Sequence, residues 1–244
     1  MLRGFWVLFN VSIWTTILGT VGALASLFEA KRGRTMGHCA RIWANVILVT
    51  SGIPYKIYGL KHLDPANQYI FAGNHGSGFD IPLAFAALPY WLVPVAKIEL
   101  RKVPVLGWVM NAGGHIFVDR SSHEKAISSM MKARDSLIKT PRSVMLWPEG
   151  SRTKDGTIAP FKRGGLLISI ETGMPVVPVA FVNSYKLHKK GSWRVNKIAV
   201  EIRIGKPIPV DNYTKETRRD FANNVRDAVV RLHESPVPGN RVGG

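Results

Sequence analysis

A histidine and an aspartate five positions apart are the strongest candidates for chemistry in this chain. His75 and Asp80 lie in a segment, 74–80, that follows the apolar run 69–72 and precedes an apolar helical pattern beginning at Ile81. The histidine therefore lies at the carboxyl end of a predicted strand, where α/β sheets place their ligands. Two intervening glycines allow the loop to turn tightly enough for the carboxylate to reach one ring nitrogen.

An imidazole paired in this way could act as a general base near neutral pH. The carboxylate of Asp80 would select one tautomer of His75 and leave the other ring nitrogen free to accept a proton. The alternative is that Asp80 only caps the following helix and that His75 is only a loop residue. One such pair does not by itself decide between these interpretations.

Two later segments add charged residues at the ends of other predicted strands. Arg120 follows the run 115–118, and its planar guanidinium suits a phosphate. Glu149 and Arg152 follow the run 143–147, where the arginine offers a second phosphate contact and the glutamate could accept hydrogen bonds from a polyol or orient an arginine. The alternative for the first segment is a local surface ion pair between Asp119 and Arg120. Together the two segments predict convergent strand ends, as in an active site.

Two cations precede a further helical pattern. Lys162 and Arg163 stand directly before the apolar residues of the segment 162–172. A helix N-terminus with flanking cations attracts anions, which makes both residues candidates for a phosphate contact. The alternative interpretation is a solvated basic turn.

From Tyr58 onward, short apolar runs alternate with helical patterns, which predicts an α/β fold with a layered, mostly parallel sheet flanked by helices. The predicted strands are 68–73, 115–118, 143–147, 176–182 and 198–204. The predicted helices are 81–88, 99–111, 123–139, 162–172 and 214–233. Pro104 and Gly107 predict a break in the second helix, and Ser122 is the expected N-cap of the third. Pro178, inside a predicted strand, indicates a sheet edge or a bend, and we favour a core strand there over a direct role in a site.

The N-terminal segment predicts a membrane anchor. Residues 4–28 include no charged side chain, and at about 1.5 Å per residue a helix of this length could cross a hydrocarbon core of about 30 Å. A shorter apolar run, 42–55, follows. We therefore predict a two-helix anchor over 1–57, an α/β domain over 58–234 and a flexible tail over 235–244.

The anchor pattern leaves its depth open. The helices could cross the bilayer or lie in one leaflet, and a buried helical hairpin in a soluble protein is the alternative. Lys31, Arg32 and Arg34 follow the first run, and such residues favour the cytoplasmic side of a cell membrane.

The composition restricts the classes of partner. The chain has 33 Lys and Arg against 16 Asp and Glu, a net charge of +17, which favours anionic lipids, phosphorylated substrates or nucleic acid. No nucleic-acid-binding module is present in the pattern, so nucleic acid is not expected. Cys39 is the single cysteine, which excludes an internal disulfide. We see no metal-ligand pattern and expect neither metal nor cofactor.

Four blocks in order resemble the glycerolipid acyltransferase family, and the resemblance covers roughly residues 58–209. The matching positions are Asn74, His75, Ser77 and Asp80; Gly114, Ile116, Phe117, Asp119 and Arg120; Pro148, Glu149, Gly150, Ser151 and Arg152; and Val177, Pro178 and Val179. Gly76 stands where a larger polar residue is frequent in the family. We interpret that departure as loop variation.

The resemblance implies a reaction. A fatty acyl group passes from acyl-CoA or acyl carrier protein to the sn-2 hydroxyl of lysophosphatidic acid at the membrane, and His75 and Asp80 act as the general-base pair. Ser77 is not a nucleophile, because the thioester donor is already activated. The substrate-binding residues it implies are Arg120, Glu149, Gly150, Ser151 and Arg152, with Lys97, Lys162 and Arg163 as further phosphate or donor contacts.

Three alternatives remain at this point. The acceptor could be another lysolipid, such as a lyso-ornithine lipid. The chain could be a basic membrane-binding protein without catalysis, in which case loss of His75 would leave its role intact. A lipid-ester hydrolase would need a nucleophile elbow or a metal site, and the sequence has neither pattern.

Overall fold

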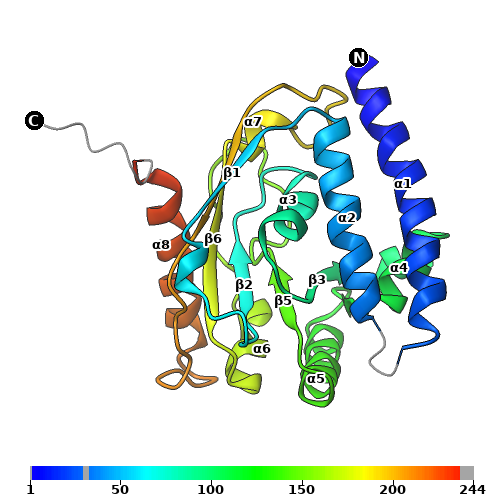
Figure 1. Ribbon diagram of the computed structural model, residues 1–244. Helices are drawn as coiled ribbons and strands as arrows, with labels where there is room; N and C mark the ends of the chain where they lie inside the picture. Colours follow the sequence, from blue (N-terminus) through cyan, green and yellow to red (C-terminus); the bar gives the residue numbers. More distant parts are fainter. Residues whose placement is uncertain (1, 30–32, 237–244) are drawn as a thin grey trace, which may run out of the picture.

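The computed structural model describes residues 2–29 and 33–236, and its centre is a seven-stranded sheet (Figure 1). The strands are β1 (Tyr55–Tyr58), β2 (Ile70–Gly73), β3 (Leu92–Lys97), β4 (Ile116–Val118), β5 (Ser143–Leu146), β6 (Val176–Val182) and β7 (Val200–Ile204). Their order is β1-β7-β6-β2-β5-β3-β4, and every neighbouring pair is parallel except β6 with β7. The predicted α/β class with a mostly parallel sheet is confirmed.

Helices cover both faces of this sheet. The helices are α1 (Leu2–Ser26), α2 (Arg34–Thr50), α3 (Asp80–Ala87), α4 (Leu106–Ala112), α5 (His123–Lys139), α6 (Arg163–Thr172), α7 (Ser184–Leu187) and α8 (Arg218–Glu234), with short 3-10 turns η1 (Leu60–His62) and η2 (Ile98–Lys102). In Figure 1, α1, α2 and α3 lie to one side of the strands and α8 to the other.

Strand periodicity divides the interior into two cores. Along β2, Phe71 packs with α2 and α3, whereas its neighbours Ile70 and Ala72 pack with α5, α6 and α8. Successive strand residues point to opposite faces, and the central strands are apolar on both because helices cover both. This explains the unbroken apolar runs that predicted them.

The sequence did not predict strands β1 and β3. β1 is a four-residue edge strand. Prolines lie within two strands, Pro94 in β3 and Pro178 in β6. The pairing of β3 with β4 begins only at Val95, and that of β6 with β7 only at Val179, so neither Pro94 nor Pro178 removes a hydrogen bond from those ladders. The favoured interpretation of the Pro178 segment as a core strand is confirmed, and an edge position is wrong, because β6 is a central strand.

The predicted helix boundaries agree closely with the structure. The pattern over 99–111 is broken as expected, into η2 and α4, and Val105 between them has a positive φ of 62°. The hydroxyl of Ser122 accepts from the N–H of Lys125 and caps α5, and α6 ends at the left-handed Gly173.

The N-terminal region combines a membrane-compatible helix with part of the core. Within the described residues, α1 alone is long and apolar enough to cross a membrane. It packs against α2 and α4 and exposes a row of apolar side chains, namely Leu2, Phe5, Trp6, Phe9, Ile13, Ile17, Val21 and Leu24. By contrast, Ala44, Ile47 and Leu48 of α2 are buried in the same core as Phe71. A second anchor helix is thus not established.

The predicted boundary at residue 57 differs from the structure, and part of the predicted terminal features lies outside the described residues. Residue 57, the expected end of the anchor, lies inside β1, so the chain enters the sheet before that point. Lys31, Arg32 and most of the predicted tail, residues 237–244, lie outside the described residues.

Phe221 on α8 provides a test of the core on the α5, α6 and α8 side. Its side chain is fully buried, with its ring centroid 4.5 Å from that of Tyr213. We expect Phe221→Ala to lower the free energy of unfolding by about 3–5 kcal/mol, since it leaves a cavity. Arg219→Ala, on the exposed side of the same helix, should change it by less than about 0.5 kcal/mol. Urea unfolding of both variants in detergent measures the difference, and equal effects would contradict this packing.

Candidate active site

The predicted contact between His75 and Asp80 is present. The Nδ1 atom of His75 lies 2.8 Å from Oδ2 of Asp80, whose side chain is fully buried. The same oxygen accepts the backbone N–H groups of Gly76 at 2.8 Å and Ser77 at 2.9 Å. No side chain caps the N-terminus of α3, so this carboxylate orders the preceding loop and the imidazole and does not cap its own helix.

This geometry sets the orientation of the imidazole. Because Nδ1 faces a carboxylate, it carries the proton, and Nε2 is left as the basic nitrogen. His75 lines the cavity described below. On one side its ring stacks against the indole of Trp147, with centroids 4.9 Å apart and planes inclined by 28°. The indole and Asp80 together hold the ring in one position.

The loop after β5 holds the backbone of His75. One carboxylate oxygen of Glu149 accepts the N–H of His75 at 2.6 Å, and the other accepts the N–H of Ala159 at 3.0 Å. The N–H of Thr153 donates to the carbonyl of His75 at 2.9 Å. Burial raises the pKa of the Glu149 carboxyl, while the two backbone donors act in the opposite direction.

Glu149 therefore does not lie at the substrate-binding position that the sequence predicted. It was expected to position the glycerol of an acceptor, but it is buried behind the loop and is not among the residues that line the cavity. Both of its oxygens are engaged with backbone groups. The geometry makes it a positioning residue for His75.

The structure explains why glycine occupies position 76, which the sequence did not reveal. A Cβ at this position would lie 2.6 Å from the hydroxyl oxygen of Ser184 and 2.8 Å from the backbone nitrogen of Tyr185. The close approach of α7 thus requires glycine here. Ser77 is fully buried, its hydroxyl accepts the N–H of Phe79, and it does not line the cavity.

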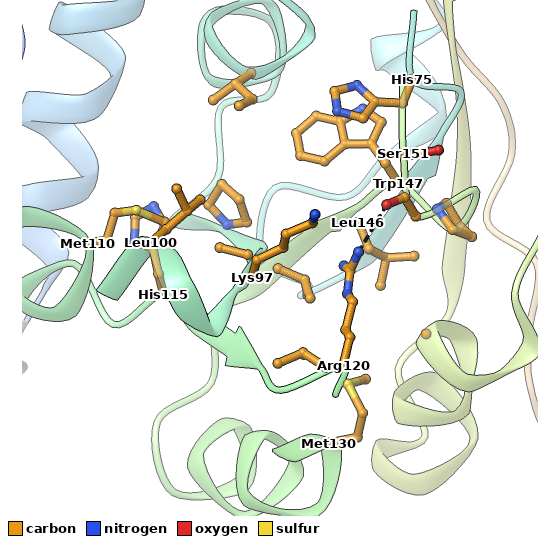
Figure 2. A pocket seen from close by; sticks show the side chains of 18 of the residues that line it. His75, Lys97, Leu100, Met110, His115, Arg120, Met130, Leu146, Trp147 and Ser151 are labelled. Carbon is orange, nitrogen blue, oxygen red and sulfur yellow. Dashed lines mark hydrogen bonds between the residues drawn. The ribbon is translucent and has the colours of Figure 1, made fainter. Parts of the chain in front are cut away.

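A cavity of about 1010 Å³ opens in front of His75 (Figure 2). With Glu149 set aside, every residue predicted to bind substrate lines it: Lys97, Arg120, Gly150, Ser151, Arg152, Lys162 and Arg163. In Figure 2, Lys97 and Arg120 extend into its centre, with His75 and Trp147 on one side. Among the described residues that line it there is no aspartate or glutamate.

Arg120 and Lys162 lie beside the turn at Gly150. Arg120 donates to the carbonyl oxygen of Gly150 at 3.0 Å, which leaves the rest of its guanidinium for a ligand. Gly150 has a left-handed backbone with φ of 78°, and Lys162 lies beside it. In the part of the chain that the structure describes, the ion pairs of Arg and Lys with carboxylates all lie away from these cations. A site this rich in unpaired positive charge favours an anionic substrate.

One arm of the cavity is apolar. It runs between α1, α2 and α4, and its lining includes Leu18, Met36, Trp43, Val109 and Met110. His115 also lines it, and burial lowers the pKa of this imidazole to about 4, so it is neutral near pH 7. The arm can accept a hydrocarbon chain.

Two features of this site were missed from the sequence. The sequence patterns gave Trp147 no role, although it lies between a strand end and Pro148 and is the stacking partner of His75. The contribution of α1 and α2 to the cavity has no local sequence signal. Over the described residues, no group of three or more His, Cys, Asp or Glu side chains could hold a metal ion.

Comparison with known proteins assigns the family. The family model described as "Acyltransferase" matches residues 54–182, which is more than half of the chain. The chain belongs to the acyltransferase family. The matched region contains His75, Asp80, Arg120 and Arg152.

Named relatives extend over most of this acyltransferase chain. A 1-acyl-sn-glycerol-3-phosphate acyltransferase of Limnanthes douglasii is 31% identical over 201 residues, covering 82% of this chain and 70% of the relative. One from Haemophilus influenzae is 28% identical over 245 residues, covering 96% and 98%. The crystal structure of the 1-acyl-sn-glycerophosphate acyltransferase PlsC from Thermotoga maritima has the same fold, with a TM-score of 0.80, 23% identity and 97% of each chain covered.

The position of Glu149 yields a kinetic prediction. Glu149→Gln replaces one acceptor oxygen by an amide NH2 that faces a backbone donor, at a cost of about 1–3 kcal/mol. We expect kcat for acyl transfer to fall about ten-fold or more while KM for the acceptor stays unchanged, because the change acts through His75. Glu171→Gln, on a carboxylate paired with Lys215 away from the cavity, is the matched control. An increase in acceptor KM at constant kcat would instead place Glu149 against the acceptor.

Proposed function

We propose that this protein transfers a fatty acyl group from a thioester donor to the sn-2 hydroxyl of 1-acyl-sn-glycerol 3-phosphate, which forms phosphatidic acid. The observation that carries the proposal is the His75–Asp80 contact at 2.8 Å beside a cavity with unpaired cations. The names of the relatives support the choice of acceptor. The donor is acyl-CoA or acyl carrier protein.

The reaction follows from the geometry of the pair. Nε2 of His75 takes the proton of the acceptor hydroxyl as its oxygen attacks the thioester carbonyl, and Asp80 stabilises the imidazolium that forms. The tetrahedral intermediate then collapses: the carbon–sulfur bond breaks, the new ester remains, and the imidazolium returns the proton to the departing thiolate. No acyl-enzyme is required, since the donor is already activated.

The charged and apolar parts of the cavity suit an amphiphilic substrate. Arg120 and Arg152 are proposed to hold the phosphate of the acceptor, with Lys97 and Lys162 nearby. Guanidinium groups bind phosphate through paired, charge-assisted hydrogen bonds. The apolar arm is proposed to hold a fatty chain.

The proposal includes a membrane location, on the cytoplasmic face of the cell membrane. It is supported by the exposed apolar row on α1 and by the net charge of +17, which attracts anionic lipid. Such a location brings the cavity to the lipid substrate and to the lipid product.

The test is acyl transfer by the purified protein in detergent or lipid. Labelled acyl-CoA and labelled acyl carrier protein are each offered with lysophosphatidic acid, lysophosphatidylcholine, lyso-ornithine lipid and glycerol 3-phosphate. Labelled phosphatidic acid is expected as the main product. Transfer chiefly to another acceptor would keep the mechanism and replace the substrate, whereas no transfer from either donor would contradict the proposal.

His75 and Asp80 are tested by removing the base and by neutralising its carboxylate partner. We expect His75→Ala and Asp80→Asn each to lower kcat by about 10²–10⁴-fold, because proton transfer or the tautomer is lost. Circular dichroism should show that both variants remain folded. Wild-type turnover by either variant would remove the pair from the mechanism.

Arg152 is tested through the phosphate of the acceptor. We expect Arg152→Ala to raise KM for lysophosphatidic acid about ten-fold, which corresponds to about 1.4 kcal/mol. Turnover of monoacylglycerol, which has no phosphate, serves as the control acceptor and should change little. Equal losses with both acceptors would assign Arg152 a structural role.

A further inference from the structure

The cavity has a second arm, on the opposite face of the sheet from the apolar arm. We call it the α5–α6 groove. Its walls are Ala126, Ile127 and Met130 of α5 and Gly164, Gly165 and Leu167 of α6, and it is continuous with the space in front of His75. Figure 2 shows Met130 below Arg120, on the far side of the central cations from Met110 and His115.

Two adjacent glycines keep this groove open. A Cβ built on Gly164 or Gly165 would meet no atom within 4 Å. Neither residue has a left-handed backbone, so neither glycine is needed to form the helix. Glycine in a helix costs about 0.5–1 kcal/mol relative to alanine. No neighbouring atom requires glycine at either position in the first turn of α6. The absence of side chains there widens the groove.

The groove differs chemically from the apolar arm. Ser121 and Ser122, which follow Arg120 in the chain, also line the cavity. Arg163 of α6 and Arg218, the first residue of α8, also line it. Over the described residues neither arginine forms an ion pair within 4.0 Å. The groove thus combines apolar walls, hydroxyl groups and unpaired cations.

We propose that the α5–α6 groove binds the phosphopantetheine arm of the acyl donor, with its phosphate at Arg163 and Arg218. The inference rests on the proposed function, which places the thioester at His75. From there a donor must extend in two directions: a hydrocarbon chain, and an arm with two amides, a short aliphatic segment and a terminal phosphate. The apolar arm matches the first, and the groove with its hydroxyls and cations matches the second.

The acyl chain of the lysolipid is a poorer occupant of the groove. It carries no amide for the serine hydroxyls and no charge for the arginines, so it would leave the polar groups of the groove without a partner of matching chemistry. The central cations, Lys97, Arg120 and Arg152, remain for the acceptor phosphate. Two anionic groups then have separate sites in one cavity.

The experiment compares donors that share the acyl chain and thioester but differ in the arm. Acyl-CoA and acyl carrier protein carry the whole phosphopantetheine, and the acyl thioester of N-acetylcysteamine carries only its inner end. The variants are Gly165→Leu, which fills the groove, and Arg218→Ala, which removes a cation. We expect each to raise KM about ten-fold for the full-length donors and to change kcat/KM for the short thioester far less.

Matched controls separate this effect from a general loss of structure. Arg219→Ala removes an exposed cation next to Arg218, and Ser128→Leu adds the same side chain to an exposed position on α5; neither residue lines the cavity. Both controls should keep wild-type KM for all donors. Gly165→Leu should not lower the unfolding temperature, because leucine favours the helix more than glycine does.

The outcomes separate the two proposals. An increase in KM for both full-length donors in the groove variants identifies the phosphopantetheine that they share. An increase for only one of them identifies that molecule as the donor that uses the groove. Equal loss with the short thioester, or no loss with any donor, would overturn the inference while leaving acyl transfer intact. Calorimetric titration with free CoA measures binding without turnover. We expect the Arg218→Ala variant to bind CoA more weakly than the Arg219→Ala control. Equal binding by the two variants would overturn the groove assignment.

Discussion

The whole site depends on one buried carboxylate. Asp80 has no exposed surface, and a charge in that environment is tolerated only when donors compensate it. The structure supplies three to a single oxygen: the imidazole of His75 and the N–H groups of Gly76 and Ser77. These contacts close the loop between β2 and α3, so the carboxylate that orients the base also determines the shape of the loop that carries it.

The order of strands explains how distant segments reach this loop. β2 pairs with β5, β5 with β3 and β3 with β4, all in parallel, so their carboxyl ends meet at one edge of the sheet. His75, Trp147 and Arg120 follow the ends of β2, β5 and β4, and Lys97 is the last residue of β3, so residues far apart in the sequence meet at this edge. Glu149 joins the first two loops by accepting the N–H of His75. Parallel pairing is therefore what converts four separate motifs into one site.

The cavity draws its character from both faces of the sheet. Helices α1, α2 and α4 add an apolar arm, and α5 and α6 add a groove of mixed polarity, while the cations stand between them at the strand ends. An amphiphilic acceptor and a thioester donor need this combination of charge and hydrocarbon surface in one space. The same α1 that lines the cavity exposes an apolar row to its surroundings, which relates access to the site to a lipid surface.

Local patterns in the sequence were sufficient to predict much of the fold and the central contact of the site. The spacing of His75 and Asp80, the apolar runs of β2, β5 and β6, the cap at Ser122 and the break before α4 are properties of neighbouring residues, and they predicted the α/β class, most of the elements and the His–Asp contact. Only the tertiary structure decided the rest. It placed Glu149 behind His75 at a separation of 74 residues, made α2 part of the core, brought α1 to the cavity and left Gly164 and Gly165 facing open space. These features arise from contacts between segments far apart in the chain, which leave no periodicity or spacing for a sequence to display.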